Sequence, residues 1–344
     1  MATLETQIAP QDLDFGIDTF GDNNAESQHQ SLLNVVEQAK LADELGLHSF
    51  NLGEHHRDDY TISSPLTTIG YLAGVTKNIH LGTAVVVLSS EDPVRVYEQA
   101  ATTHVLSGGR VELTVGRGSF TESFPLFGYK LQDYEPLFDE KLEMLVKIWN
   151  ERPFSWEGHF TQKLDRQLLY PEIDTSTLPV FVAVGGSPQS VVRTAHFDLG
   201  LRLAIIGGAP ERFAPFADLY RRAQEEFGHT QRRSIGFHAP GIVADTDDEA
   251  VDAFRDDYLR FNKRVGAERG WPPMTEARFR QEVEDGALFV GSPQTVATKL
   301  ARAFRALGAD TFNMKMGQGN QDQHLKSIDL YANKVIPMVR DMLS

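Results

Sequence analysis

The chain has 344 residues and no cysteine, and its 33 basic and 48 acidic side chains give a formal net charge of −15. The lack of cysteine excludes disulfides, thiolate nucleophiles and cysteine-ligated metal centres. The acidic balance argues against non-specific binding to nucleic acid or to an anionic membrane. Residues 1–14 do not resemble a secretion signal and no apolar run is long enough to span a membrane, so we expect a cytoplasmic protein.

Strand-like and helix-like segments alternate along the chain. Strands are predicted over residues 15–19, 49–52, 79–88, 111–115, 179–184, 203–206, 235–243 and 311–316. Helices are predicted over residues 31–44, 65–75, 93–106, 138–149, 188–196, 210–227, 293–307 and 325–343, with a further helix starting at a capping box of Thr246 and Glu249. Eight alternating strands predict a (β/α)₈ TIM barrel over residues 15–344, behind a flexible tail of residues 1–14. A doubly wound open sheet is the alternative.

Three stretches between predicted elements are too long to be plain connections. They cover residues 118–137, 150–178 and 266–288. Connections in compact domains are usually short, and long ones often carry function. We therefore expect loop insertions at the C-terminal face of the barrel that act as active-site lids or subunit contacts.

The segment of residues 79–118, IHLGTAVVVLSSEDPVRVYEQAATTHVLSGGRVELTVGRG, is predicted to fold as strand, helix and strand. Its length suits one crossover of a parallel sheet. The Gly-Arg-Gly ending alone indicates no more than a glycine-rich turn. The whole segment, however, resembles the third strand, third helix and fourth strand of the bacterial luciferase-like flavin-dependent monooxygenases. Residues 288–317 resemble the last helix and eighth strand of the same family.

Two nearly identical pentapeptides, GSPQS at residues 186–190 and GSPQT at residues 291–295, each begin a predicted helix. Serine at the N-cap and proline at the first helical position make simple helix starts, and the free amides of such an end also suit a phosphate. Phosphate sites of barrels often lie near the last strands, which favours the later copy. The family resemblance instead implies that the earlier copy binds the flavin phosphate, together with the arginine after the fourth strand. The residues concerned are Arg117, Gly185, Gly186, Ser187 and Ser190.

Glu54, His55 and His56 follow the predicted strand 49–52. Neighbouring strand residues point to opposite faces, so both histidines cannot face one barrel mouth. This weakens a metal site, and we assign no metal ligands. Taken alone, such residues are as often plain hydrogen-bonding groups. The resemblance implies that His55 faces the flavin and exchanges a proton during oxygen chemistry, a task that suits an imidazole near neutral pH.

Small residues in the predicted strand 79–88 would let a flat ring lie against the backbone. The resemblance implies that Ala84 and Val85 contact the flavin and are joined by a non-prolyl cis peptide bond. Such bonds are rare and need a surrounding structure that holds them.

The resemblance implies an enzyme, a flavin-dependent monooxygenase that uses reduced FMN and O₂ to oxygenate a small organic substrate through a C4a-peroxyflavin. Because no dinucleotide-binding fingerprint follows a predicted strand, we expect a separate reductase to supply the reduced flavin. Three alternatives remain open. They are an F420-dependent oxidoreductase on the same fold, a flavin-binding protein without turnover, and a metal-dependent barrel hydrolase that uses His55 or His56.

Members of the family commonly dimerise through helices that correspond to residues 65–75 and 93–106 here. The second helix has more apolar residues than one core-facing stripe requires. They are Val94, Val96, Ala100, Ala101 and Val105. Scattered small residues on an outer face need no partner. The breadth of the apolar surface nevertheless predicts a two-fold homodimer through this helix, with Ala101 facing outward.

Overall fold

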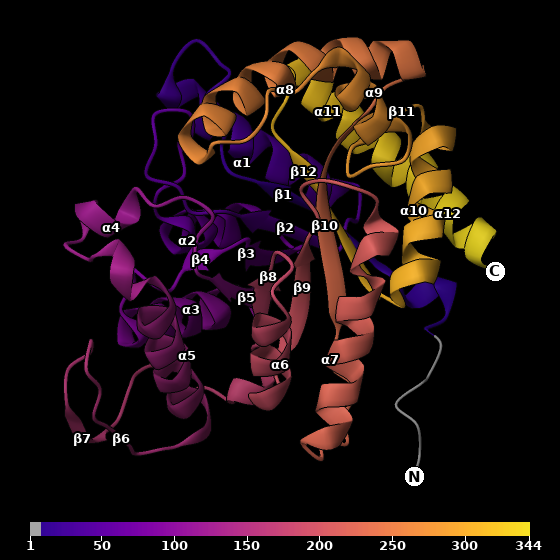
Figure 1. Ribbon diagram of the computed structural model, residues 1–344. Helices are drawn as coiled ribbons and strands as arrows, with labels where there is room; N and C mark the ends of the chain where they lie inside the picture. Colours follow the sequence, from indigo (N-terminus) through magenta and orange to yellow (C-terminus); the bar gives the residue numbers. More distant parts are fainter. Residues whose placement is uncertain (1–7) are drawn as a thin grey trace.

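The computed structural model describes residues 8–344 and shows a closed barrel of eight parallel strands surrounded by helices (Figure 1). In sheet order the strands are β1 (Asp14–Thr19), β2 (Ser49–Leu52), β3 (His80–Thr83), β5 (Val111–Gly116), β8 (Val180–Val184), β9 (Gly200–Ala204), β10 (Ile235–Val243) and β12 (Thr311–Met316). β12 pairs with β1, and parallel pairing of β9 with β10 completes the ring. The predicted TIM barrel is confirmed, and the open-sheet alternative is wrong.

Four further strands lie outside this ring or extend it. β4 (Val86–Val87) follows β3 after a break and pairs with β5. β11 (Phe289–Gly291) pairs with the end of β10 beyond the ring. β6 (Phe154–Trp156) and β7 (Leu164–Gln167) form an antiparallel hairpin.

The helices of the barrel cover its outside. They are α1 (Gln28–Glu44), α2 (Pro65–Val75), α3 (Pro93–Leu106), α5 (Tyr134–Asn150), α6 (Pro188–His196), α7 (Ala214–Glu226), α10 (Pro293–Leu307), α11 (Gln321–Leu330) and α12 (Ile336–Leu343). Additional helices are α4 (Ser123–Leu126), α8 (Asp247–Arg269) and α9 (Glu276–Glu284). α8 and α9 lie at the top of the view in Figure 1, beyond the end at which the chain leaves β10.

The pleat of the strands separates an apolar shell from a polar barrel interior. On β1, Phe15 and Ile17 belong to the main apolar core. Asp18 points to the other face, where its carboxylate accepts a hydrogen bond from Asn51 of β2 (2.8 Å) and contacts His238 of β10 (2.8 Å). Buried polar side chains therefore lead up the inside of the barrel to the site described below.

Most predicted elements are present, and the differences have physical causes. The predicted strand 79–88 is divided into β3 and β4 at the Ala84–Val85 bond. The strand predicted over residues 203–206 is β9 instead, because Gly200 pairs with Phe181 of β8 and leaves room for its ring. α11 starts at Gln321 rather than at residue 325, and a short π-helical segment separates it from α12. The irregular stretches 150–178 and 266–288 contain the β6–β7 hairpin and α9.

The predicted flexible tail lies partly outside the described residues. In its described part, Ile8 packs against the main core and Leu13 is buried. The carbonyl of Leu13 also accepts a hydrogen bond from Arg340 of α12. Residues 8–14 are thus attached to the barrel. Within residues 8–344, no helix is both long enough and apolar enough to cross a membrane.

The predicted outward position of Ala101 on α3 is wrong. Ala101 is fully buried and belongs to a second apolar cluster with Tyr97, Met144 and Trp156. The β6–β7 hairpin and α5 cover this face of α3, which explains why the helix carries apolar residues on two sides. The large apolar side chains that α3 exposes are Val105 (55% accessible) and Leu106 (75% accessible), both at its C-terminal end.

Candidate active site

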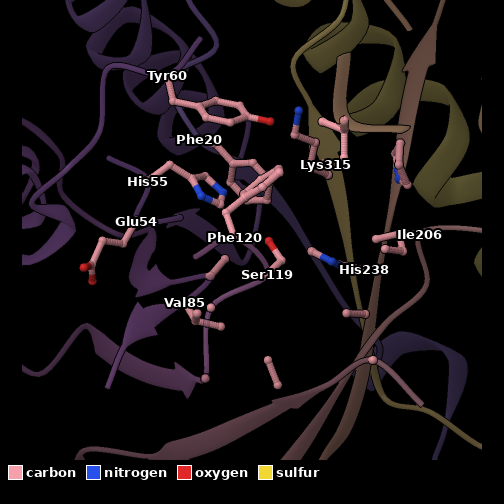
Figure 2. Close-up of a pocket in the computed structure, with 18 of the residues that line it drawn as sticks. Phe20, Glu54, His55, Tyr60, Val85, Ser119, Phe120, Ile206, His238 and Lys315 are labelled. Carbon is pink, nitrogen blue, oxygen red and sulfur yellow. The ribbon is translucent and has the colours of Figure 1, made fainter. Parts of the chain in front are cut away.

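A cavity of about 330 Å³ opens at the C-terminal ends of the barrel strands. Its walls come from the strand ends and the loops that follow them (Figure 2). α8 and the residues just after it contribute further lining. The lining is rich in aromatic side chains, which are Phe20, Tyr60, Phe120, Tyr134, Tyr258, Phe261 and Trp271. Apolar walls with a few polar groups are typical of sites for small organic ligands.

Of the predicted site residues, the structure brings five into this one cavity. They are His55, Ala84, Val85, Arg117 and Gly185. The other three, Gly186, Ser187 and Ser190, lie next to Gly185 at the start of α6 and outside the cavity lining. The cavity therefore joins positions that are 130 residues apart in sequence.

His55 is buried among aromatic rings. It stacks on Tyr60 (ring centroids 4.5 Å apart) and meets the edges of Phe20 (4.8 Å) and Phe120 (5.1 Å), as Figure 2 shows. Burial lowers the pKa of His55, and it outweighs the Glu122 carboxylate, 3.8 Å from Nδ1, which acts in the opposite direction. The imidazole is therefore neutral at neutral pH and can accept a proton inside the cavity.

Glu54 and His56 explain how the end of β2 is fixed. The buried Glu54 carboxylate accepts a hydrogen bond from the amide of Val87 on β4 (2.9 Å) and contacts His56 Nε2 (3.0 Å). Hydrogen bonding to Glu54 raises the pKa of His56. His56 is not in the cavity lining, so the two histidines diverge as strand alternation predicted.

The predicted non-prolyl cis peptide bond between Ala84 and Val85 is present. Neighbouring backbone holds this segment: the Ala84 amide donates to the carbonyl of Leu52 (2.8 Å), and the Val85 carbonyl accepts from the amide of Glu54 (3.1 Å). The Val85 side chain packs directly over Gly116, where an added Cβ would come within 3.0 Å of it. Ala84 and Val85 both line the cavity with apolar side chains.

The start of α6 has the features of an anion site. Ser187 caps the helix by accepting from the amide of Ser190 (3.4 Å), and the buried Ser190 Oγ has no hydrogen-bond partner within residues 8–344. Gly186 has φ +115°, which favours glycine, and a Cβ added at Gly185 would meet open space. Arg117 faces the same region and is paired with the Glu135 carboxylate. Space, donors and a cation are all present, so these residues fit a phosphate group.

At the later pentapeptide, a carboxylate of the protein itself already binds the donors at the start of the helix. Ser292 caps α10, but the Asp247 carboxylate accepts hydrogen bonds from the amide of Ser292 (2.6 Å) and from the hydroxyl of Thr295 (3.0 Å). A carboxylate already satisfies this helix N-terminus. Of the two copies, the structure leaves the one after β8 available for an anion.

Sequence reasoning missed a second histidine. His238 of β10 lines the cavity, and Figure 2 shows it opposite His55, directed toward the interior. Its Nδ1 is 2.8 Å from Asp18, whose other oxygen is bound by Asn51. Asp18 and His238 are polar residues within otherwise apolar predicted strands, and this was the available signal. A buried carboxylate on one ring nitrogen fixes the orientation and tautomer of the imidazole.

The C-terminal half of α8, which lines the cavity, is fastened to two loops. Glu268 binds the guanidinium of Arg57 through two contacts (2.7 and 3.0 Å), and Arg264 binds Asp58. Arg269 donates to the carbonyl of Ser119. The predicted lid stretches 118–137 and 266–288 both contribute to the lining, whereas the described residues of 150–178 contribute none.

A model of the luciferase-like monooxygenase family matches residues 13–311 of this sequence. The chain belongs to the luciferase-like monooxygenases. The predicted family, and with it the enzyme class, is confirmed. The chain is 22% identical over 341 residues to the oxygenase component of flavin-dependent trigonelline monooxygenase from Acinetobacter baylyi, covering 92% of each protein.

The names of two solved structures with this fold mention different cofactors, FMN and coenzyme F420. The oxygenating constituent of 3,6-diketocamphane monooxygenase from Pseudomonas putida, in complex with FMN, superposes with a TM-score of 0.78 at 22% identity, covering 95% of this chain and 98% of that one. The coenzyme F420-dependent tetrahydromethanopterin reductase from Methanopyrus kandleri superposes with a TM-score of 0.72 at 17% identity, covering 94% and 99%. At these identities the likeness establishes the fold that luciferase-like monooxygenases share.

Proposed function

We propose that this luciferase-like monooxygenase binds reduced FMN and uses O₂ to oxygenate a small organic substrate. The observation that carries the proposal is a single cavity that joins the neutral, buried His55 to the apolar Ala84–Val85 segment and to Arg117 and Gly185. A cofactor with an aromatic ring system at one end and a phosphate at the other matches the positions of these apolar and anion-binding residues.

Each part of the flavin has a proposed partner. The phosphate would be bound by Arg117, by the backbone of Gly185 and Gly186, and by the start of α6, where the unpartnered Ser190 hydroxyl is a further donor. The ring would lie on the Ala84–Val85 segment. When bound, reduced FMN supplies the electrons that activate O₂, and the protein supplies binding, orientation and shielding from water.

His55 and His238 are the groups that would handle protons. His55 is the stronger candidate, because burial among Phe20, Tyr60 and Phe120 keeps its imidazole neutral. His238 is oriented by Asp18 and leaves its second ring nitrogen for the cavity. General acid–base catalysis needs such groups within reach of the reacting atoms.

Phosphate binding has a competitor within the chain. The Glu135 carboxylate is paired with Arg117 and lies 3.7 Å from Arg193 of α6. A phosphate would take over the role of this carboxylate, since an arginine fork binds either anion. Glu135 thus sets how easily Arg117 becomes available to a cofactor.

The alternatives make different demands. An F420-dependent oxidoreductase has support from the Methanopyrus structural neighbour, and a flavin-binding protein without turnover needs the same cavity. A metal-dependent hydrolase built on His55 or His56 has none, because no group of three metal-ligating side chains found within residues 8–344 includes either one. We also propose that a separate reductase supplies the reduced flavin, in keeping with the relatives named as an oxygenase component and an oxygenating constituent.

The first experiment identifies the cofactor. Purified protein is titrated anaerobically with reduced FMN and, separately, with reduced F420, and binding is followed by absorbance and fluorescence. We expect saturable binding of reduced FMN at one site per chain. Tight binding of F420 together with weak binding of FMN would overturn the proposal in favour of hydride transfer.

We further propose a homodimer in which α2 and α3 contribute to the interface. These helices pack on one another, and they expose Tyr71 (60% accessible) and Val105. Light scattering at micromolar concentration should give twice the chain mass, and V105D should shift it toward the monomer. A monomer mass for the unaltered protein would contradict the proposal. A dimer unaffected by V105D would place the interface elsewhere.

A further inference from the structure

Three metal-ligating side chains converge at the end of the barrel opposite the cavity. His48 directly precedes β2, His80 is the first residue of β3, and Glu112 is the second residue of β5. These strands are neighbours in the order β2, β3, β5. Parallel strands begin at the same edge of a sheet, so residues far apart in the sequence meet here.

The donor atoms are close enough to share one ion. His48 Nε2 lies 3.2 Å from Glu112 Oε1, and His80 Nδ1 lies 3.1 Å from the same oxygen. All three donor atoms lie within 4.8 Å of one another. Ligand atoms on one tetrahedral zinc ion, at bond lengths of about 2.0–2.1 Å, are about 3.3–3.4 Å apart. The cluster needs only small side-chain movements to reach that geometry.

A second carboxylate orients one of the imidazoles. Asp14 Oδ1 is 3.0 Å from His48 Nδ1, the nitrogen that faces away from Glu112. Metal-bound histidines almost always donate their other ring N–H to such a group, which fixes the tautomer and the ring orientation. The Asp14–His48 contact therefore leaves Nε2 as the nitrogen for an ion.

The cluster is also reachable from solvent. The side chain of His80 is 40% accessible, whereas that of Glu112 is 12% accessible and anchored inside. The His48 and His80 rings lie stacked, with centroids 4.7 Å apart. An ion can enter past His80 and keep water as its remaining ligand.

We propose that His48, His80 and Glu112 bind a divalent transition-metal ion of the zinc type, with Asp14 as the positioning residue for His48. The ion would join the starts of three adjacent strands. Residues at this end of a TIM barrel serve stability more than catalysis, so the expected role is structural. The proposal is independent of the oxygenase function, since none of these residues lines the cavity.

Protons compete with the ion. Burial lowers the pKa of His48, but its hydrogen bonds to Asp14 and Glu112 outweigh burial and raise the pKa to about 10. A metal-free cluster is then held together by a protonated His48 between two carboxylates. Metal binding must displace that proton. The alternative to a metal site is therefore a metal-free cluster that is held together by these hydrogen bonds.

The test uses the full-length protein after treatment with a chelator. Calorimetric titration with Zn²⁺ should give one ion per chain, and the melting temperature should rise with Zn²⁺. H80A is the main variant, since its exposed side chain is not needed for the core. D14N should weaken Zn²⁺ binding by about 10–100-fold, and H80A should weaken it at least as much. H29A, at an exposed histidine on α1, is the matched control and should bind as the unaltered protein does.

The outcomes separate clearly. Absorption bands of tetrahedral Co²⁺ in the unaltered protein that are lost in H80A would support the site. Equal Zn²⁺ binding by the unaltered protein, H80A and H29A would overturn it, as would a lack of stoichiometric binding. H80A should bind reduced FMN unchanged, so failure of either proposal leaves the other open to its own test.

Discussion

The strand ends that form the floor of the cavity and the helix α8 that forms its roof are held in place by different interactions. The floor consists of strand ends, where buried side chains such as Glu54, Asp18 and Asn51 form hydrogen bonds at 2.8–3.0 Å within the barrel. The roof is α8, fastened by ion pairs of Arg57 with Glu268 and of Arg264 with Asp58, whose carboxylates are 42% and 76% accessible. Buried, satisfied networks hold one geometry, whereas exposed ion pairs contribute little and are screened by salt. The floor is therefore suited to chemistry and the roof to access.

The largest expected effect is on the floor, at His55. H55A should lower turnover by about 10²–10⁴-fold with flavin binding largely intact, because a proton-handling group is lost from the cavity. H56A is the matched control and should cost much less, since His56 is not in the cavity lining and contacts the Glu54 carboxylate instead. Steady-state rates and flavin titrations measure both. Equal losses in the two variants would contradict the assignment.

Replacing Arg117, which lines the cavity, should affect the binding of reduced FMN rather than the chemical step. R117A removes a charge-assisted contact with the phosphate and should weaken reduced FMN by roughly 1.5–3 kcal/mol. That range is about ten- to hundredfold in the dissociation constant. E135Q removes the competing carboxylate and should instead tighten binding. Anaerobic titration decides, and unchanged affinity in R117A would reject the phosphate assignment.

Breaking the roof should have a smaller effect. E268Q cuts the paired contacts with Arg57, and we expect the KM for the organic substrate to rise by at most about fivefold, which corresponds to about 1 kcal/mol. R260Q is the control, because Arg260 pairs with Asp257 of the same helix. The effect should shrink as salt is added. A large loss of turnover in E268Q would mean that the roof takes part in chemistry.

The smallest expected change is a shift of the pH profile. Burial lowers the pKa of His55 from 6.5, so the acid limb of turnover should lie below pH 6.5. Glu122 raises this pKa, and E122Q should therefore move the acid limb to still lower pH. Turnover measured as a function of pH checks this. A limb that moves upward in E122Q would show that another group titrates.

The floor was largely predictable from the sequence. The strand ends, the Glu-His-His run and the glycine-rich turns are local patterns, and β2, α2, α6, β10, α10 and β12 match their predicted bounds. The pairing of Asp18 with His238 joins residues 220 positions apart, and nothing local to either strand encodes it. The choice between the two pentapeptides likewise depended on Asp247, which tertiary folding brings to the later copy.

The roof was predictable only in part. The capping box of Thr246 and Glu249 predicted where α8 begins, and Thr246 does cap the helix by accepting from the amide of Glu249. α9 buries a single residue, Phe279, so it has no apolar stripe from which a helix can be recognised. α9 packs on α8 in a separate apolar cluster and contributes no residue to the cavity lining. The ion pairs of α8 involve a loop that precedes it by about 200 residues. The outward position predicted for Ala101 was wrong for a similar reason, since the hairpin that covers this residue was interpreted as an irregular loop.

Oxygen transfer itself is the most direct test of the central claim. The unaltered protein and H55A are supplied with reduced FMN, isotope-labelled O₂ and a panel of alkanes, aldehydes, sulfonates and aromatic amines, and the products are analysed by mass spectrometry. We predict a product that carries one labelled oxygen atom, formed by the unaltered protein and strongly reduced in H55A. Bound reduced FMN whose oxygen consumption yields hydrogen peroxide alone, with no labelled product from any member of the panel, would contradict the account.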